Sequence, residues 1–127
     1  MTTTRNRQPR LRYRSVTGAA VVAVSGDLTV RRAEVSRQWR DLPIRNDERV
    51  IVVDLSRIRH VTTGGVDALL DVLVALHHRG HEIRLVDPQP LVRMTLFLAG
   101  IPPWAAMYHD LPAALAGEDR IDDAAVL

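Results

Sequence analysis

Short apolar runs alternate along this chain with longer segments in which apolar residues recur every three or four positions. A run without polar alternation, such as VIVVDL at residues 50–55, is typical of a strand covered on both faces of a sheet. Recurrence every three or four residues is typical of a helix with one buried stripe. The alternation predicts an α/β fold with a mostly parallel central sheet.

The first two predicted strands lie in LRYRSVTGAAVVAVSGDL and form an N-terminal β-hairpin about a turn at Thr17 and Gly18. The second of them covers residues 20–25. Pro43 should end the first of about four helices, and Gly80 suits the end of the second. The other predicted strands cover residues 50–55, 81–87 and 105–109, and the predicted helices cover residues 29–42, 65–79, 91–98 and 111–117.

The composition is that of one globular domain. The chain has 127 residues, of which 46% are apolar and 25% charged. No apolar run is long enough to span a membrane, and the N-terminal stretch lacks the apolar region of a secretory signal. Cysteine is absent, which excludes disulfides and thiolate chemistry and fits a cytoplasmic protein.

Charge is unevenly distributed. The net charge is +2, yet five arginines and no acid lie within the first 14 residues. We expect residues 1–10 to form a basic, flexible arm, residues 11–117 the folded domain, and residues 118–127 an acidic tail. The arm could contact nucleic acid or an acidic partner, but a solvated tail is the ordinary case, so we expect no direct nucleic-acid partner and no membrane.

Most catalytic and cofactor signatures are missing. A phosphate-binding loop needs a lysine, and the chain has none. Neither Gly-x-Gly-x-x-Gly nor Gly-x-Ser-x-Gly is present. His77 and His81 are four residues apart, but Gly80 should break the helix between them, so we expect surface or helix-end histidines and no metal site. We therefore predict no enzyme, no cofactor and no metal.

Asp54 and the two tryptophans allow a functional and a structural interpretation. An aspartate at the end of a buried strand resembles the phosphoacceptor of a response-regulator receiver, but a receiver also needs a lysine. The alternative is a carboxylate that caps a nearby turn. Trp39 lies on a predicted apolar stripe, so we expect it and Trp104 to be packing residues.

The stretch HVTTGGVDALL, residues 60–70, joins a predicted strand to a predicted helix. A threonine before a helix can accept a backbone N–H bond, worth about 1 kcal/mol. A hydroxyl at a helix N-terminus is also a favourable place for a phosphate. The position leaves both interpretations open for Thr62 and Thr63.

Three phrases, in this order and spacing, resemble the STAS domain, in particular the bacterial anti-sigma factor antagonists, over about residues 11–117. VVAVSGDLTV resembles the family's strand and Gly-Glu/Asp-Leu-Asp-like turn. VIVVDLSRIRHVTTGGVDALL resembles its central strand, Asp-Leu-Ser phrase and Asp-Ser-Ser-Gly loop, and HEIRLVDPQPLVRMTLFLAGI resembles the following strand and helix. The resemblance implies a STAS-like fold.

The resemblance also implies a transcription regulator that works by exchanging partners. Family members bind an anti-sigma factor that is a serine/threonine kinase of the histidine-kinase-like ATPase type, and this frees the sigma factor. The kinase phosphorylates the loop, and the added charge breaks the complex. We expect a monomer or weak dimer.

This chain departs from the family in the loop itself. Alignment places Asp-Ser-Ser-Gly on Thr62, Thr63, Gly64 and Gly65, so the usual phosphoacceptor is replaced by Gly64. Thr63, and then Thr62, are the remaining possible phosphosites. A non-phosphorylatable STAS scaffold or ligand-sensing subunit is the alternative function. The predicted partner-binding residues are Asp27, Leu28, Thr29, Thr62, Thr63, Gly64, Asp67, Asp71 and Val74.

Overall fold

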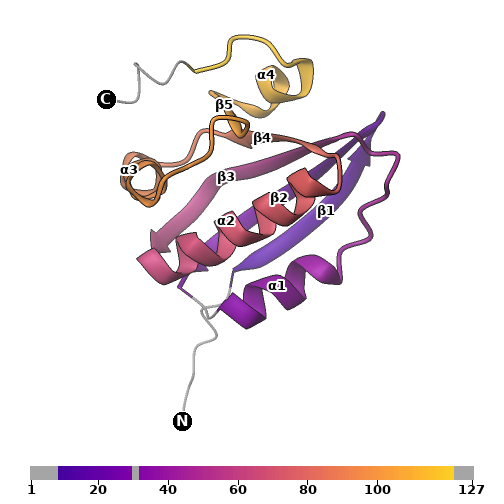
Figure 1. Ribbon diagram of the computed structural model, residues 1–127. Helices are drawn as coiled ribbons and strands as arrows, with labels where there is room; N and C mark the ends of the chain where they lie inside the picture. Colours follow the sequence, from indigo (N-terminus) through magenta and orange to yellow (C-terminus); the bar gives the residue numbers. More distant parts are fainter. Residues whose placement is uncertain (1–8, 30–31, 122–127) are drawn as a thin grey trace.

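The computed structural model, which describes residues 9–29 and 32–121, contains one five-stranded sheet with helices on both faces (Figure 1). The strands lie side by side in chain order, the first pair antiparallel and the rest parallel. The elements are β1 (Arg10–Val16), β2 (Ala19–Leu28), α1 (Arg32–Arg40), β3 (Val50–Val61), α2 (Thr63–His78), β4 (Glu82–Val86), α3 (Pro90–Ala99), β5 (Ala106–Tyr108) and α4 (Leu111–Ala116). The predicted fold class and the N-terminal hairpin are confirmed.

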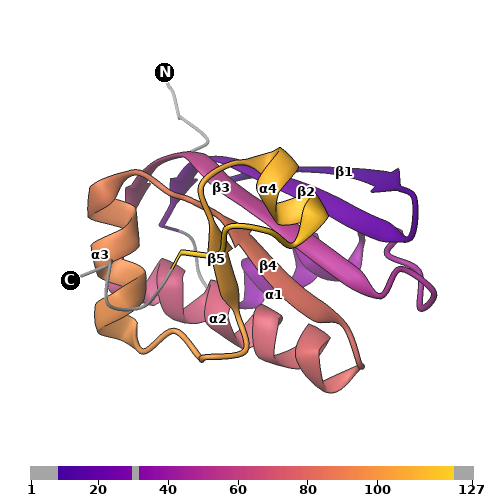
Figure 2. The ribbon, with the colours of Figure 1, turned by 90° about the horizontal axis from the view of Figure 1, so that it is seen from above.

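Strand alternation divides the core into two layers. Val22, Val53 and Leu85 point to the face that α1, α2 and α3 cover, and they belong to the larger apolar cluster. Their neighbours, among them Val21 and Val52, form a smaller cluster with α4 on the other face (Figure 2). Each fully buried side chain of this size contributes about 1.5–3 kcal/mol. Because both faces are covered, the apolar runs do not alternate.

β3 is longer than the sequence predicted, because it continues to Val61 instead of ending at residue 55. Beyond Asp54 it pairs only with β2, so its polar side chains face solvent. The register with β2 shifts twice along this part. Asp54 supports the first shift, since its Oδ1 accepts bonds from the backbone N–H and the hydroxyl of Ser56 at 3.0 and 2.6 Å. The local capping interpretation of Asp54 fits this geometry.

The buried carboxylate of Glu48 ties the hairpin to the loop before β3. It accepts hydrogen bonds from the hydroxyls of Tyr13 and Ser15 and from the backbone N–H of Arg45. Burial opposes ionisation, but these bonds outweigh it and lower the pKa of Glu48. The bond to the carboxylate also raises the pKa of Tyr13.

The ends of the domain differ in part from the prediction. Residues 1–8 and 122–127, which hold most of the predicted arm and tail, lie outside the described residues, as do residues 30–31 before α1. The described chain continues to pack beyond residue 117, because Ile121 is buried and its N–H donates to the Met107 carbonyl at 2.8 Å. Trp39 is buried in the core, which confirms its packing role.

Candidate functional site

The candidate site lies where β2 and β3 end and α2 begins, at one end of the sheet (Figure 1). Leu28 and Val61 are register partners at the ends of their strands. The backbone N–H of Thr62 then donates to the Leu28 carbonyl at 3.1 Å. This bond brings together two segments that the sequence separates by more than thirty residues.

Gly65 allows this close approach. A Cβ atom at Gly65 would lie 1.9 Å from the Leu28 carbonyl oxygen, much closer than real Cβ contacts. The first turn of α2 therefore packs directly against the end of the β2 backbone, where a side chain has no room.

Thr62 and Thr63 have different roles in the loop. Thr62 is the N-cap, and its hydroxyl accepts the backbone N–H of Gly65 at 3.0 Å. Thr63 is the first residue of α2 and is exposed, with no hydrogen bond from its hydroxyl to the described residues. The Thr62 hydroxyl therefore serves the helix cap, whereas the Thr63 hydroxyl has no such bond within the described residues.

Gly64 faces solvent and has space around it. A Cβ atom there would meet only the Thr62 hydroxyl oxygen, at 4.0 Å. The backbone of Gly64 lies in the helical turn and not in the left-handed region. A serine at this position would therefore fit without strain, so its absence is a feature of the sequence and not a steric requirement.

Asp67 and Asp71 extend the site along α2. Both are exposed, and their spacing from Thr63 places all three on one side of the helix. Asp71 has a further interaction within the structure. Val74 follows on the same side but is half-buried and lies outside both core clusters. Asp67 lies in the second turn of α2, slightly farther from its N-terminus than the sequence suggested.

Leu28 is a correction to the predicted partner-binding set. Its side chain is only 1% exposed and belongs to the main core cluster. The alternation of β2 turns its side chain inward, so it packs beneath the exposed residues of the site. Thr29, the next residue, is exposed.

Sequence reasoning missed His60 as a member of this site. His60 is the register partner of Asp27, and its Nδ1 lies 2.9 Å from the Asp27 carboxylate. The Asp27 side chain is 15% exposed and that of His60 is 69% exposed. A prediction that β3 continues past residue 55 would have placed His60 on the strand beside β2, but the sequence pattern did not give this extension. We call the exposed and half-exposed members the α2 entry face: Asp27, Thr29, His60, Thr62, Thr63, Gly64, Asp67 and Asp71.

Within the described residues, the remaining histidines belong to no cluster that could hold a metal ion. Among residues 9–29 and 32–121, no group of three His, Cys, Asp or Glu side chains could hold a metal ion. His81 lies just beyond the end of α2 and is buried, and its Nδ1 lies 2.8 Å from the Glu48 carbonyl oxygen. His77 stacks on Trp104 with ring centroids 4.0 Å apart, so Trp104 has a packing contact.

Every helix in the described part of the chain is too short or too polar to cross a bilayer.

A family model of the STAS domain matches residues 10–114. The chain belongs to the STAS domain family. No curated protein matches this STAS domain in sequence.

Solved structures with the same fold include two anti-sigma factor antagonists. One is an anti-sigma factor antagonist from Mycobacterium paratuberculosis, with 20% identity over 91% of this chain and 97% of the other and a TM-score of 0.65. The second is the anti-sigma factor antagonist SpoIIAA in its unphosphorylated form, with 19% identity over 85% of this chain and 97% of the other and a TM-score of 0.56.

Proposed function

We propose that this STAS domain is an anti-sigma factor antagonist that binds an anti-sigma factor through the α2 entry face and thereby releases a sigma factor. The observation that carries the proposal is the meeting of the β2 end with the α2 entry loop, which gathers an exposed hydroxyl and acidic side chains on one surface. The shared fold with two anti-sigma factor antagonists supports it. The output is binding and not catalysis, and the partner is a serine/threonine kinase of the histidine-kinase-like ATPase type.

We assign Thr63 as the residue that this kinase modifies. Thr62 uses its hydroxyl to cap α2, whereas the Thr63 hydroxyl is open to solvent. A phosphate at the first residue of α2 would lie near the positive end of the helix dipole. It would also place nearly two negative charges beside Asp67 in a close interface, where repulsion between like charges and the cost of desolvation weaken binding.

Purification from the native organism, followed by mass spectrometry and affinity measurement with the recovered kinase, tests the binding role. We expect a one-to-one complex and a loss of at least about tenfold in affinity for Asp67→Arg. Asp41→Arg is the matched control, because Asp41 is also exposed but follows α1, at the end of the sheet where β3 begins (Figure 1). Recovery of no kinase-like or sigma-regulating protein would refute the proposal.

Incubation with the recovered kinase and ATP tests the modification. Thr63→Val should abolish phosphate incorporation, while Thr62→Val should retain it. Gly64→Ser fits the space at that position and should add a second acceptor.

The absence of a hydroxyl at Gly64 favours one alternative, a STAS scaffold or ligand-sensing subunit that is never phosphorylated. In that case the wild-type chain binds its partner but takes up no phosphate, and only Gly64→Ser is modified.

A further inference from the structure

Helix α3 carries an apolar surface that nothing in the described chain covers. Every large apolar side chain that is exposed among the described residues lies on this helix. Leu91, Met94 and Leu98 are 68%, 60% and 77% exposed, and their spacing places them on one stripe. Phe97, 39% exposed, lies at the edge of this stripe. We call these four residues the α3 face.

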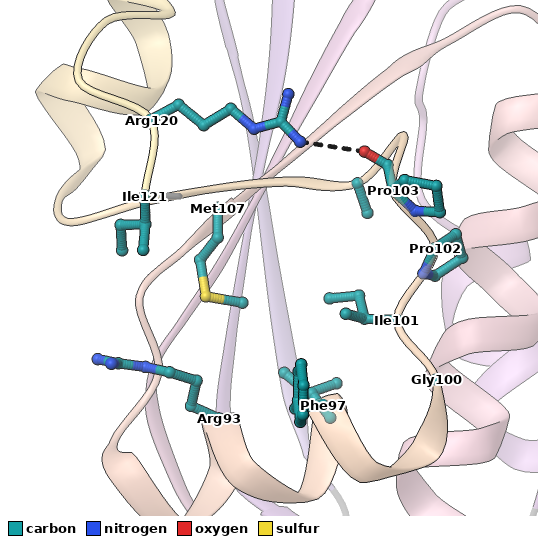
Figure 3. A pocket seen from close by; sticks show the side chains of 11 residues that line it. Arg93, Phe97, Gly100, Ile101, Pro102, Pro103, Met107, Arg120 and Ile121 are labelled. Atoms are coloured by element: carbon teal, nitrogen blue, oxygen red, sulfur yellow. Dashed lines mark hydrogen bonds between the residues drawn. The ribbon is translucent and has the colours of Figure 1, made fainter. Parts of the chain in front are cut away.

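A cavity of about 200 Å³ opens beside the α3 face (Figure 3). The side chains of Phe97, Ile101 and Met107 converge on it. Cavities of about 150 Å³ with apolar walls hold a benzene molecule, so this one can hold a single aromatic or branched side chain. Arg120 also lines the cavity and donates one guanidinium N–H to the Pro103 carbonyl at 3.1 Å.

The area of the α3 face limits what can cover it. With roughly 150–250 Å² for a fully exposed large side chain, its four residues expose about 500 Å². A stable interface needs about 800 Å² from each partner, so the α3 face supplies little more than half. Two copies of the chain packed through this face alone would bury about 1,000 Å², below the range of stable specific complexes. A stable occupant must therefore contact a second, neighbouring surface.

The α2 entry face is that neighbouring surface. α3 packs against α2 and β3, and both ribbon views show it at the end of the molecule where α2 begins (Figures 1 and 2). We propose that the α3 face docks an apolar helix face of the same anti-sigma factor that contacts the α2 entry face, and that this partner inserts one large apolar side chain into the cavity. This inference rests on the proposed function. In this proposal the apolar contacts of α3 supply much of the binding affinity, whereas the charged residues and the phosphosite of α2 control whether the partner binds.

Single substitutions on the α3 face test the inference by titration calorimetry with the recovered anti-sigma factor. Leu98→Glu and Met94→Glu change exposed side chains, so the thermal midpoint should stay unchanged while affinity falls about tenfold or more. Phe97→Ala removes one wall of the cavity and should weaken binding by a similar factor. Ala116→Glu, at an exposed position of α4 across the sheet, is the matched control and should bind as the wild type.

The outcomes separate the two proposals. If the wild-type chain binds the anti-sigma factor and the three α3 variants bind it with the same affinity, the α3 inference is overturned and the proposed function stands. Sedimentation equilibrium tests whether the occupant is a second copy of the chain. If the wild-type chain is a dimer, the three variants are monomers and their affinity for the anti-sigma factor is unchanged, the α3 inference is also overturned. Absence of any wild-type complex would refute the proposed function itself, and the α3 inference with it.

Discussion

Adding one methyl group to Gly65 should destabilise the fold, whereas the same change at the neighbouring Gly64 should stabilise it. The two glycines are adjacent in the first turn of α2, but only Gly65 faces the β2 backbone. In Gly65→Ala the new Cβ would lie 1.9 Å from the Leu28 carbonyl oxygen and 2.6 Å from its carbon. Real contacts of this kind stay beyond 3.0 Å, so α2 and β2 must separate.

The free-energy cost of Gly65→Ala has two parts. Overpacking a tight contact costs about 1–3 kcal/mol. Moving the loop also weakens the bond from the Thr62 N–H to the Leu28 carbonyl, worth about 1 kcal/mol. Gly65→Ala should therefore lower the free energy of unfolding by about 2–4 kcal/mol. Gly64→Ala meets no atom closer than 4.0 Å and restricts the unfolded chain, so it should raise that free energy by about 0.4–1 kcal/mol.

Urea unfolding followed by circular dichroism measures both changes. The test is the difference between two variants of identical composition, so errors of extrapolation largely cancel. If Gly65→Ala unfolds at the wild-type urea concentration, or if both variants shift in the same direction by similar amounts, the close approach of α2 to β2 described above is wrong.

Three further predictions concern stability. Thr62→Val should lower the free energy of unfolding by about 1 kcal/mol through loss of the cap, while Thr63→Val should change it by less than about 0.5 kcal/mol, both measured by urea unfolding. Leu28→Asp buries a charge in the core, so we expect a chain that circular dichroism reports as largely unfolded; a native spectrum would contradict the burial of Leu28. The pKa of Glu48 is lower in the folded state than in the unfolded state, so its ionised carboxylate stabilises the fold. This stabilisation is fully present above the unfolded-state pKa of about 4.3 and is lost as the pH falls through and below that value. Stability measured from pH 7 to pH 3 should therefore fall less steeply in Glu48→Gln than in the wild type, and equal slopes would contradict this role.

Local patterns were enough to predict the order of elements. Residues 50–55 form an almost unbroken apolar run because both faces of their strand are covered, so this cause is visible directly in the sequence. The extension of β3 to Val61 has no comparable pattern in the sequence. Its second half has one neighbouring strand and polar, exposed side chains, so the residues resemble a loop. The pairing of Asp27 with His60 depends on that extension and was missed with it.

The sequence by itself determined the fold class, the hairpin, the start of a helix near TTGG and the lack of a hydroxyl at Gly64. These depend on residue identity and on contacts between near neighbours in the chain. Only the tertiary structure decided that Thr62 caps the helix while Thr63 stays open, that Leu28 points inward, and that the described residues leave the apolar side of α3 uncovered. The cap itself is a local bond, but the residue at which α2 begins follows from the pairing of β3 with β2. The positions of Leu28 and α3 depend on which distant segment lies against them, and the spacing of apolar positions gives no information about that.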